Sequence, residues 1–235
     1  MLYLIGLGLN EKGYSKEAYE IISKADKIYV DTYTIEFPYK ISALISQFRG
    51  KRFMAVGRDF VEGLKFLDEA KKNDVVLLVY GSPLVATTHT AIIKEAVEKK
   101  IKIKIIHAGS ILDAIAETGL QPYKFGKTTS LPNFPVESYL DVVKENLKVN
   151  AHTLILVDIG LNFEGAIKRL NLDSKKKGIK LEKIIICERL GLKDSKIYYD
   201  SINKLKSKKV KTPFCFIVPG KMHFLEEEVL ESFKV

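Results

Sequence analysis

The sequence predicts an α/β protein made of two α/β domains with a cleft between them, in which the N-terminal sheet is mostly parallel. Three observations support this fold class. Apolar runs alternate with segments of helical periodicity from the first residues onward. The periodicity stops once, between Tyr123 and Tyr139, among glycine, prolines and threonines. Hydrophobic residues make up 46% and charged residues 29% of the chain, as in soluble globular proteins. We therefore expect domains at 1–122 and 140–235, joined by a linker at 123–139.

The first half of the chain contains five apolar runs that predict strands. They cover residues 2–8, 27–33, 52–56, 75–80 and 101–108. Helical periodicity between them predicts helices over 15–24, 40–48 and 61–72, and another that begins at Pro83. Strands with two apolar faces and intervening helices indicate a parallel sheet with crossover connections.

The second half continues the alternation with fewer elements. Strands are predicted at 153–160, 183–191 and 214–220, with helices near Ala166 and from about Ile197 to Lys206. We find no internal repeat and no low-complexity segment, so this half is expected to be a second α/β domain.

The longest uncharged stretch of the chain runs from Val75 to Ile93. Its length approaches that of a membrane span, but Gly-Ser-Pro at its centre favours a strand, a tight turn and a helix start. Ser82 followed by Pro83 is typical of a helix N-cap and first helical position. No basic region precedes the first apolar run, because the first lysine is Lys12. We expect a cytoplasmic protein that does not enter a membrane.

The net charge of +9 is distributed unevenly. Residues 1–150 carry 21 basic and 18 acidic groups, whereas residues 151–235 carry 17 and 11, so the excess is +3 and +6. Such a surface suits nucleic acid or an acidic protein, but a solvated basic face is an equal alternative because the lysine runs contain no interleaved aromatic residues. No stable nucleic-acid partner is expected.

The spacing of the cysteines and histidines along the chain does not predict a metal site. Cys187 and Cys215 form no CxxC pair and lie in apolar runs, where buried free thiols are expected. The four histidines are scattered along the chain. The chain also lacks a GxSxG motif and a P-loop, so hydrolysis by a serine nucleophile and nucleotide hydrolysis have no support.

Three turns resemble one another and follow the carboxyl ends of predicted parallel strands, where open α/β sheets bind ligands. Their sequences are GLGLN, GSPLV and AGSIL. Small residues allow backbone groups to reach a ligand, and Leu9, Val85 and Ile111 could form an apolar wall that suits an adenosyl group. The first turn is not a complete dinucleotide fingerprint, because Glu11 occupies the third glycine position. A plain strand-end turn is an alternative for this turn.

Seven motifs, in order along nearly the whole chain, resemble the diphthine branch of the tetrapyrrole-methylase-like family of S-adenosylmethionine-dependent methyltransferases. They are LYLIGLGL, GSPLVATTH, IHAGSI, YKFGK, SYLDVVKEN, HTLILVDI and IVPGKMH. The resemblance implies two α/β domains, usually in a homodimer, with S-adenosyl-L-methionine as methyl donor. It also implies methylation of the amino group of a modified histidine in elongation factor 2, which gives diphthine during diphthamide biosynthesis.

The resemblance further implies donor-binding positions in both halves of the chain. They are Leu9, Ser82, Val85, Ser110, Ile111, Val157, Leu190 and Phe214. Two of them depart from the family pattern: relatives commonly carry Asp where this chain has Ser82, and some carry His where it has Phe214. The loss of a carboxylate at Ser82 is expected to change the affinity or geometry of donor binding.

The catalytic residues stay unknown at this point. The donor's sulfonium is already activated, so the protein needs mainly to position the reactants, which can lower the barrier by roughly 7–11 kcal/mol. His89 and His223 are proton-acceptor candidates, although a structural role is favoured for each. Two alternative functions stay open: a methyltransferase of the same fold that acts on a tetrapyrrole precursor or ribosomal RNA, and a non-enzymatic basic RNA-binding module.

Overall fold

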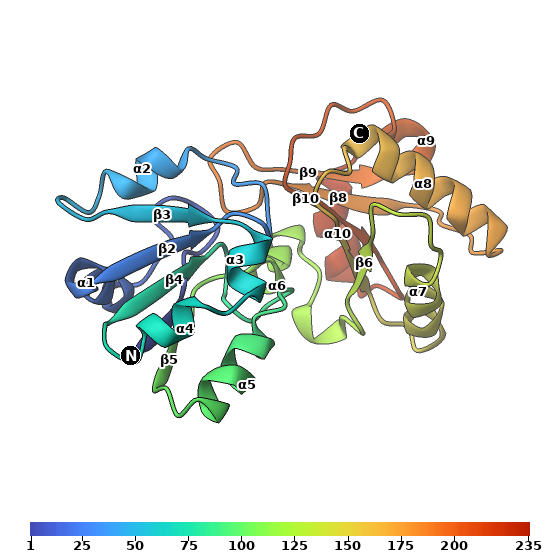
Figure 1. The fold of residues 1–235 in the computed structure, drawn as a ribbon. Coiled ribbons are helices and arrows are strands. Elements are labelled where there is room, and N and C mark those ends of the chain that lie inside the picture. Colours follow the sequence, from blue (N-terminus) through green and yellow to red (C-terminus); the bar gives the residue numbers. More distant parts are fainter. The chain divides into compact units, whose positions relative to one another are not determined.

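The computed structural model describes residues 1–235 and divides into two compact units, Met1–Leu112 and Asp113–Val235. Each unit contains one five-stranded sheet (Figure 1). The division falls earlier in the chain than the boundary expected at 122. The segment 123–139, for which the sequence predicts a linker, contributes a strand to the second sheet.

The sheet of the first unit has the strand order β3-β2-β4-β1-β5, and every neighbouring pair is parallel. Its strands are β1 (Leu2–Gly6), β2 (Lys27–Asp31), β3 (Phe53–Val56), β4 (Val75–Val79) and β5 (Ile103–Ile106). All five strands lie within the predicted ranges, and the expected parallel sheet is confirmed. Because β1 lies between β4 and β5, the turns that follow these three strands leave the same end of the sheet.

The helices of the first unit are shorter than predicted. They are α1 (Lys16–Lys24), α2 (Ile41–Ile45), α3 (Arg58–Glu62), α4 (Phe66–Glu69) and α5 (Thr90–Glu98), and α6 (Ile111–Ala114) follows β5. The single helix predicted over 61–72 is wrong: two short helices are separated near Leu64, whose φ of 55° cannot continue a right-handed helix.

Helices cover both faces of the first sheet, which explains its apolar strands. Ile5, Val30 and Leu78 belong to one core cluster together with residues of α1 and α2. The alternate strand residues Leu4 and Leu77 belong to a second cluster with residues of α3, α4 and α5. Successive side chains of a strand point to opposite faces, so this sheet needs apolar residues at nearly every position.

The sheet of the second unit is mixed. Its order is β6-β7-β10-β8-β9, with β6 parallel to β7 and the other pairs antiparallel. Its strands are β6 (Thr129–Leu131), β7 (Thr153–Val157), β8 (Ile184–Glu188), β9 (Lys196–Asp200) and β10 (Phe214–Val218).

The prediction of one helix from Ile197 to Lys206 is wrong. Residues 196–200 form β9, and a helix follows only at α9 (Ile202–Leu205). The isoleucine and tyrosines of this segment favour a strand, and pairing of Tyr198 with Ile186 of the antiparallel neighbour β8 outweighs the helical periodicity.

The other helical elements of the second unit are η1 (Ile115–Thr118), η2 (Pro122–Lys124), α7 (Tyr139–Lys148), α8 (Phe163–Lys176) and α10 (Phe224–Glu231). Residues of α7, α8 and α9 form one core cluster with alternate residues of the strands, among them Ile186 and Phe216. The structure contains no helix that is both long and apolar enough to cross a membrane. The uncharged stretch 75–93 consists of β4, a loop and the start of α5.

Candidate functional site

The three turns singled out in the sequence converge at one end of the first sheet. Gly8 and Gly81 exchange backbone hydrogen bonds, with N–O distances of 3.2 Å and 3.0 Å. The Tyr80 hydroxyl donates to the carbonyl oxygen of Leu9 at 2.9 Å. The first two turns therefore form one connected structure at the carboxyl ends of β1 and β4.

Glycine at position 6 allows this convergence. A Cβ added to Gly6 would lie 2.6 Å from the carbonyl oxygen of Gly81 and 2.9 Å from the Cβ of Ala108. No real Cβ tolerates such distances, so only glycine lets the ends of β1, β4 and β5 approach one another this closely. Gly8 has a φ of 68°, which also favours glycine.

Five of the predicted donor-binding residues lie at this end of the sheet. Leu9 follows β1, Ser82 and Val85 follow β4, and Ser110 and Ile111 follow β5. Ser82 and Ser110 are buried, and the other three are half-buried. The first unit thus places three turns of small residues and three apolar side chains at one end of the sheet, a combination that suits an adenosyl group.

Ser82 is not a helix cap, so that prediction is wrong. Residues 83–89 form turns and bends, and α5 begins only at Thr90. Ala86 has a φ of 55° and interrupts any helix that would start at Pro83. The side chain of Ser82 makes no hydrogen bond within the protein, although its carbonyl oxygen accepts from the N–H of Val85 at 3.1 Å. Its hydroxyl is therefore available to a ligand.

The loop 83–89 is held in place by His89 and Asp31. His89 Nε2 lies 3.1 Å from Asp31 Oδ2, and the side chains are 1% and 0% exposed. His89 Nδ1 lies 3.0 Å from the carbonyl oxygen of Pro83. His89 is thus a buried residue beside the converging turns, in agreement with the structural role favoured for it. Asp31 has no distinguishing signal in the sequence, because only the folded sheet places the end of β2 beside this loop.

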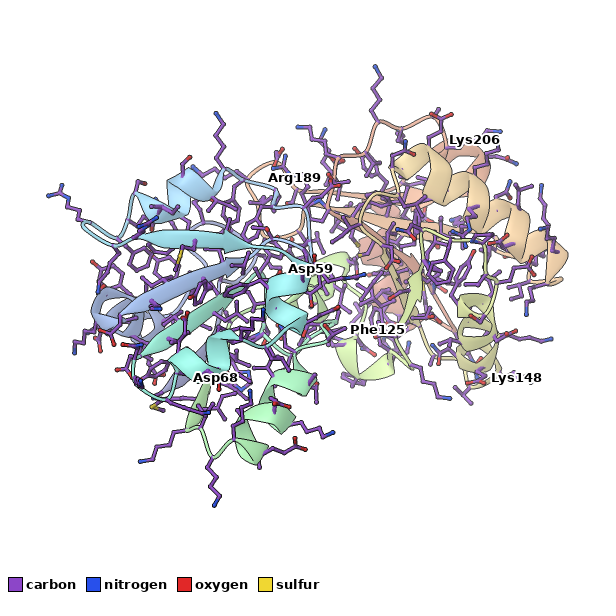
Figure 2. All side chains as sticks on the ribbon, viewed as in Figure 1. Asp59, Asp68, Phe125, Lys148, Arg189 and Lys206 are labelled. Carbon is purple, nitrogen blue, oxygen red and sulfur yellow. The ribbon has the colours of Figure 1, made fainter.

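The three positions predicted in the second half gather at one end of the second sheet. Val157 ends β7, Leu190 follows β8, and Phe214 begins β10. Because β10 lies antiparallel to both β7 and β8, its first residue meets their carboxyl ends. The backbone N–H of Arg189 donates to the carbonyl oxygen of Pro213 at 2.9 Å, which ties the β8 loop to β10. Figure 2 labels Arg189 in this loop.

These second-unit residues differ in how much they can offer a ligand. Phe214 and Leu190 are buried, whereas Val157 is half-buried. The Phe214 ring packs against Phe163 with a centroid distance of 5.6 Å and belongs to the core. Phenylalanine here therefore stabilises the sheet end and supplies no polar atom, in contrast to the histidine that the resemblance associates with this position.

His223 is exposed and serves as the N-cap of α10. Its ring accepts from the N–H of Leu225, and Glu226 closes a capping box by accepting from the His223 N–H at 2.7 Å. This structural role agrees with the favoured interpretation of His223.

The chain is similar to known proteins over both of its units. The model of the family described as Tetrapyrrole (Corrin/Porphyrin) Methylases matches residues 1–206. A diphthine synthase of Methanocaldococcus jannaschii is 39% identical over 98% of both chains, and one of Methanococcus maripaludis is 38% identical over the same shares. A crystal structure of a diphthine synthase superposes with a TM-score of 0.92 at 32% identity, covering 99% of this chain and 95% of the other.

Proposed function

Since the chain belongs to the diphthine synthases of the tetrapyrrole methylase family, and is thus an S-adenosylmethionine-dependent methyltransferase of diphthamide biosynthesis, we propose that its acceptor is elongation factor 2. The methylated group would be the amino group of the modified histidine. The observation that carries the proposal is the identity of 39% over 98% of both chains, because it spans both units.

The first unit is the proposed site for the adenosyl part of the donor. Three features support this: the close approach of the three strand ends that glycine at position 6 permits, the free hydroxyl of Ser82, and the half-buried side chains of Leu9 and Ile111. Backbone groups of the three turns can hydrogen-bond the base and ribose, and apolar side chains can pack on the rings. Ser110 and Val85 complete the proposed set in this unit.

In the second unit, Val157, Leu190 and Phe214 are the proposed contacts of the donor. Val157 is half-buried and offers apolar surface directly, whereas Leu190 and Phe214 are buried at the same sheet end, so the three would add packing and exclude water without adding charge. Substitutions in the two units can be tested separately, since each group is built by its own sheet.

Methyl transfer needs little acid–base chemistry from these residues. S-adenosylmethionine supplies a methyl group on a positively charged sulfur. In the proposed reaction, the lone pair of the acceptor amine would form the nitrogen–carbon bond while the carbon–sulfur bond breaks and its electrons stay on the sulfur of the demethylated product, and the methylated amine would then release a proton to solvent. The protein residues hold the two reactants in line and keep water out, which accounts for most of the rate gain in such a reaction.

We also propose that the protein acts as a cytoplasmic homodimer. The family resemblance supports this proposal. So do the apolar side chains of Phe224 and Leu225 at the start of α10, each of which is more than half exposed. Light scattering would detect the dimer, and a monomer at micromolar concentration would contradict this part of the proposal.

Transfer from labelled S-adenosylmethionine tests the acceptor directly. Elongation factor 2 carrying the unmethylated intermediate should become labelled, whereas elongation factor 2 without the intermediate and ribosomal RNA should not. Labelling of RNA alone would contradict the proposed acceptor and favour the other methyltransferase function considered from the sequence.

A further inference from the structure

The carbonyl oxygen of Pro83 is fixed by two side chains from its own loop. Thr87 Oγ1 donates to it at 2.8 Å, and His89 Nδ1 lies 3.0 Å from it. Pro83 stands between Ser82 and Val85, two proposed donor contacts. The position of this carbonyl therefore determines where both contacts are placed.

His89 is in turn held by the body of the sheet. Its Nε2 lies 3.1 Å from Oδ2 of Asp31, the last residue of β2, which pairs with β4; the two atoms are close and buried but are not aligned as a hydrogen bond, so the directional contact of His89 is the one from Nδ1. Asp31 is oriented by the backbone N–H of Tyr33 at 2.9 Å and by the N–H and hydroxyl of Thr34 at 3.3 Å and 2.8 Å. A continuous chain of contacts thus runs from the end of β2 to the Pro83 carbonyl.

Stability alone does not explain this buried pair. Removing a carboxyl group and an imidazole from water costs free energy, and well-packed apolar residues often serve a core as well as or better than buried polar pairs. Apolar packing, however, gives no directional hold on a carbonyl group. The loop 83–89 has no helical hydrogen bonds to fix it, and Ala86 has a left-handed φ of 55°. Directional contacts from side chains are needed here.

We propose that His89 is a positioning residue for the methyl donor. Together with Asp31 it sets the conformation of the loop that carries Ser82 and Val85, without touching the reacting atoms. This inference rests on the proposed donor site.

Two conservative variants separate the two halves of the contact chain. In His89→Asn, the side-chain amide can donate near the position of Nδ1. This variant therefore keeps the hydrogen bond to the Pro83 carbonyl and loses the contact with Asp31. In His89→Gln, the side-chain amide reaches the position of Nε2. This variant therefore keeps the contact with Asp31 and loses the hydrogen bond to the Pro83 carbonyl. Each variant loses one buried contact, and both should lose similar stability.

Calorimetry with S-adenosylmethionine and with its demethylated product is the test. His89→Gln should weaken binding about tenfold, the usual value of one hydrogen bond, whereas His89→Asn should stay within about threefold of the unaltered protein. Thr87→Val removes the second donor to Pro83 from a half-buried position and should also weaken binding severalfold. Lys94→Gln, on the exposed side of α5, is the control.

The inference would be overturned if the two His89 variants and Thr87→Val all bound the donor as tightly as the unaltered protein while their unfolding midpoints fell. That result would show a purely structural role. Failure of the unaltered protein to bind the donor would instead contradict the proposed function. If both His89 variants unfold, the Thr87→Val variant decides: unchanged affinity overturns the inference and weakened affinity supports it.

Discussion

His152 Nε2 lies 3.2 Å from Glu226 Oε1, and both side chains are almost fully buried. His152 Nδ1 accepts from the backbone N–H of Gly220 at 2.9 Å, so the ring proton is on Nε2 and faces the carboxylate. Glu226 also accepts from the N–H groups of Gln121 and His223, and it pairs with Lys124. One carboxylate therefore joins the start of α10 to the segment around η2 and to β7.

This arrangement predicts that the second unit is sensitive to acid. Burial raises the pKa of Glu226, but hydrogen bonds from Lys124, from two backbone N–H groups and from His152 outweigh it and lower the pKa to about 2. A depressed carboxyl pKa stabilises the fold fully above the ordinary value of 4.5, and this contribution is lost as the pH falls from there toward 2. Burial also lowers the pKa of His152 below its ordinary 6.5, so protonation of the unfolded chain reduces stability below about pH 6.5.

Urea unfolding measured from pH 7 down to pH 3 checks this prediction. The free energy of unfolding should fall throughout, with the steepest loss below pH 4.5. Glu226→Gln should lower stability at pH 7 and flatten the slope below pH 4.5, while Glu228→Gln, at an exposed position, should change neither. An unaltered slope in Glu226→Gln would show that this carboxylate does not cause the acid sensitivity.

Gly6→Ala should damage the first unit and its ligand site together. The added Cβ would meet the Gly81 carbonyl oxygen at 2.6 Å, so β1 and β4 must separate at their carboxyl ends. Such overpacking typically costs about 1–3 kcal/mol, and donor affinity should fall by at least tenfold because the turns move apart. Gly57→Ala is the matched control, since a Cβ there meets nothing within 4 Å. Calorimetry and thermal unfolding of the two variants measure the difference, and normal donor binding in Gly6→Ala would be the contrary result.

Substitution of Ser82 tests both its role and its departure from the family. Ser82→Ala should leave the thermal midpoint unchanged, because the hydroxyl caps no helix and makes no hydrogen bond within the protein. A capping serine would instead cost about 1 kcal/mol on removal. Ser82→Asp adds the carboxylate that the family resemblance implies for this position, and a charge-assisted hydrogen bond should tighten donor binding about tenfold. Calorimetry with the donor gives the answer, and unchanged affinity in Ser82→Asp would remove position 82 from the donor site.

Both cysteines should be unreactive in the folded protein. Cys187 and Cys215 are cross-strand partners on β8 and β10, with 1% and 2% of their surfaces exposed. A contact with Cys215 and burial together raise the pKa of the Cys187 thiol, which suppresses the reactive thiolate. A colourimetric thiol reagent should detect no thiol at pH 8 without denaturant and two thiols in guanidinium. Rapid reaction of the native protein would show that the second sheet opens.

Most of the first unit and half of the site are predictable from the sequence. The strands of the sheet interior are buried at nearly every position, so β1, β2 and β4 are recognisable as apolar runs, and parallel strands necessarily place their following turns at one end of the sheet. The sequence alone therefore groups Leu9, Val85 and Ile111, whereas Ser82 enters the set through the family resemblance. In contrast, the mixed order of the second sheet depends on long-range pairing, so only the family resemblance indicates Phe214.

The wrong predictions also have physical causes. Ser82-Pro83 has the local signature of a helix start, but Ala86 and the contacts of Thr87 and His89 with the Pro83 carbonyl hold the segment as a loop. Segment 196–200 has residues suited to both helix and strand, and its pairing with β8 decides between them. The contact of Asp31 with His89 joins residues far apart in the chain and has no local signal in the sequence.

The mass of elongation factor 2 after incubation tests the central claim most directly. Elongation factor 2 bearing the unmethylated histidine intermediate is incubated with this protein and S-adenosylmethionine. The mass of the intact factor is then measured by mass spectrometry. We predict a gain of whole methyl groups that depends on both the intermediate and the donor. An unchanged mass under conditions in which calorimetry shows that the donor binds would contradict the claim.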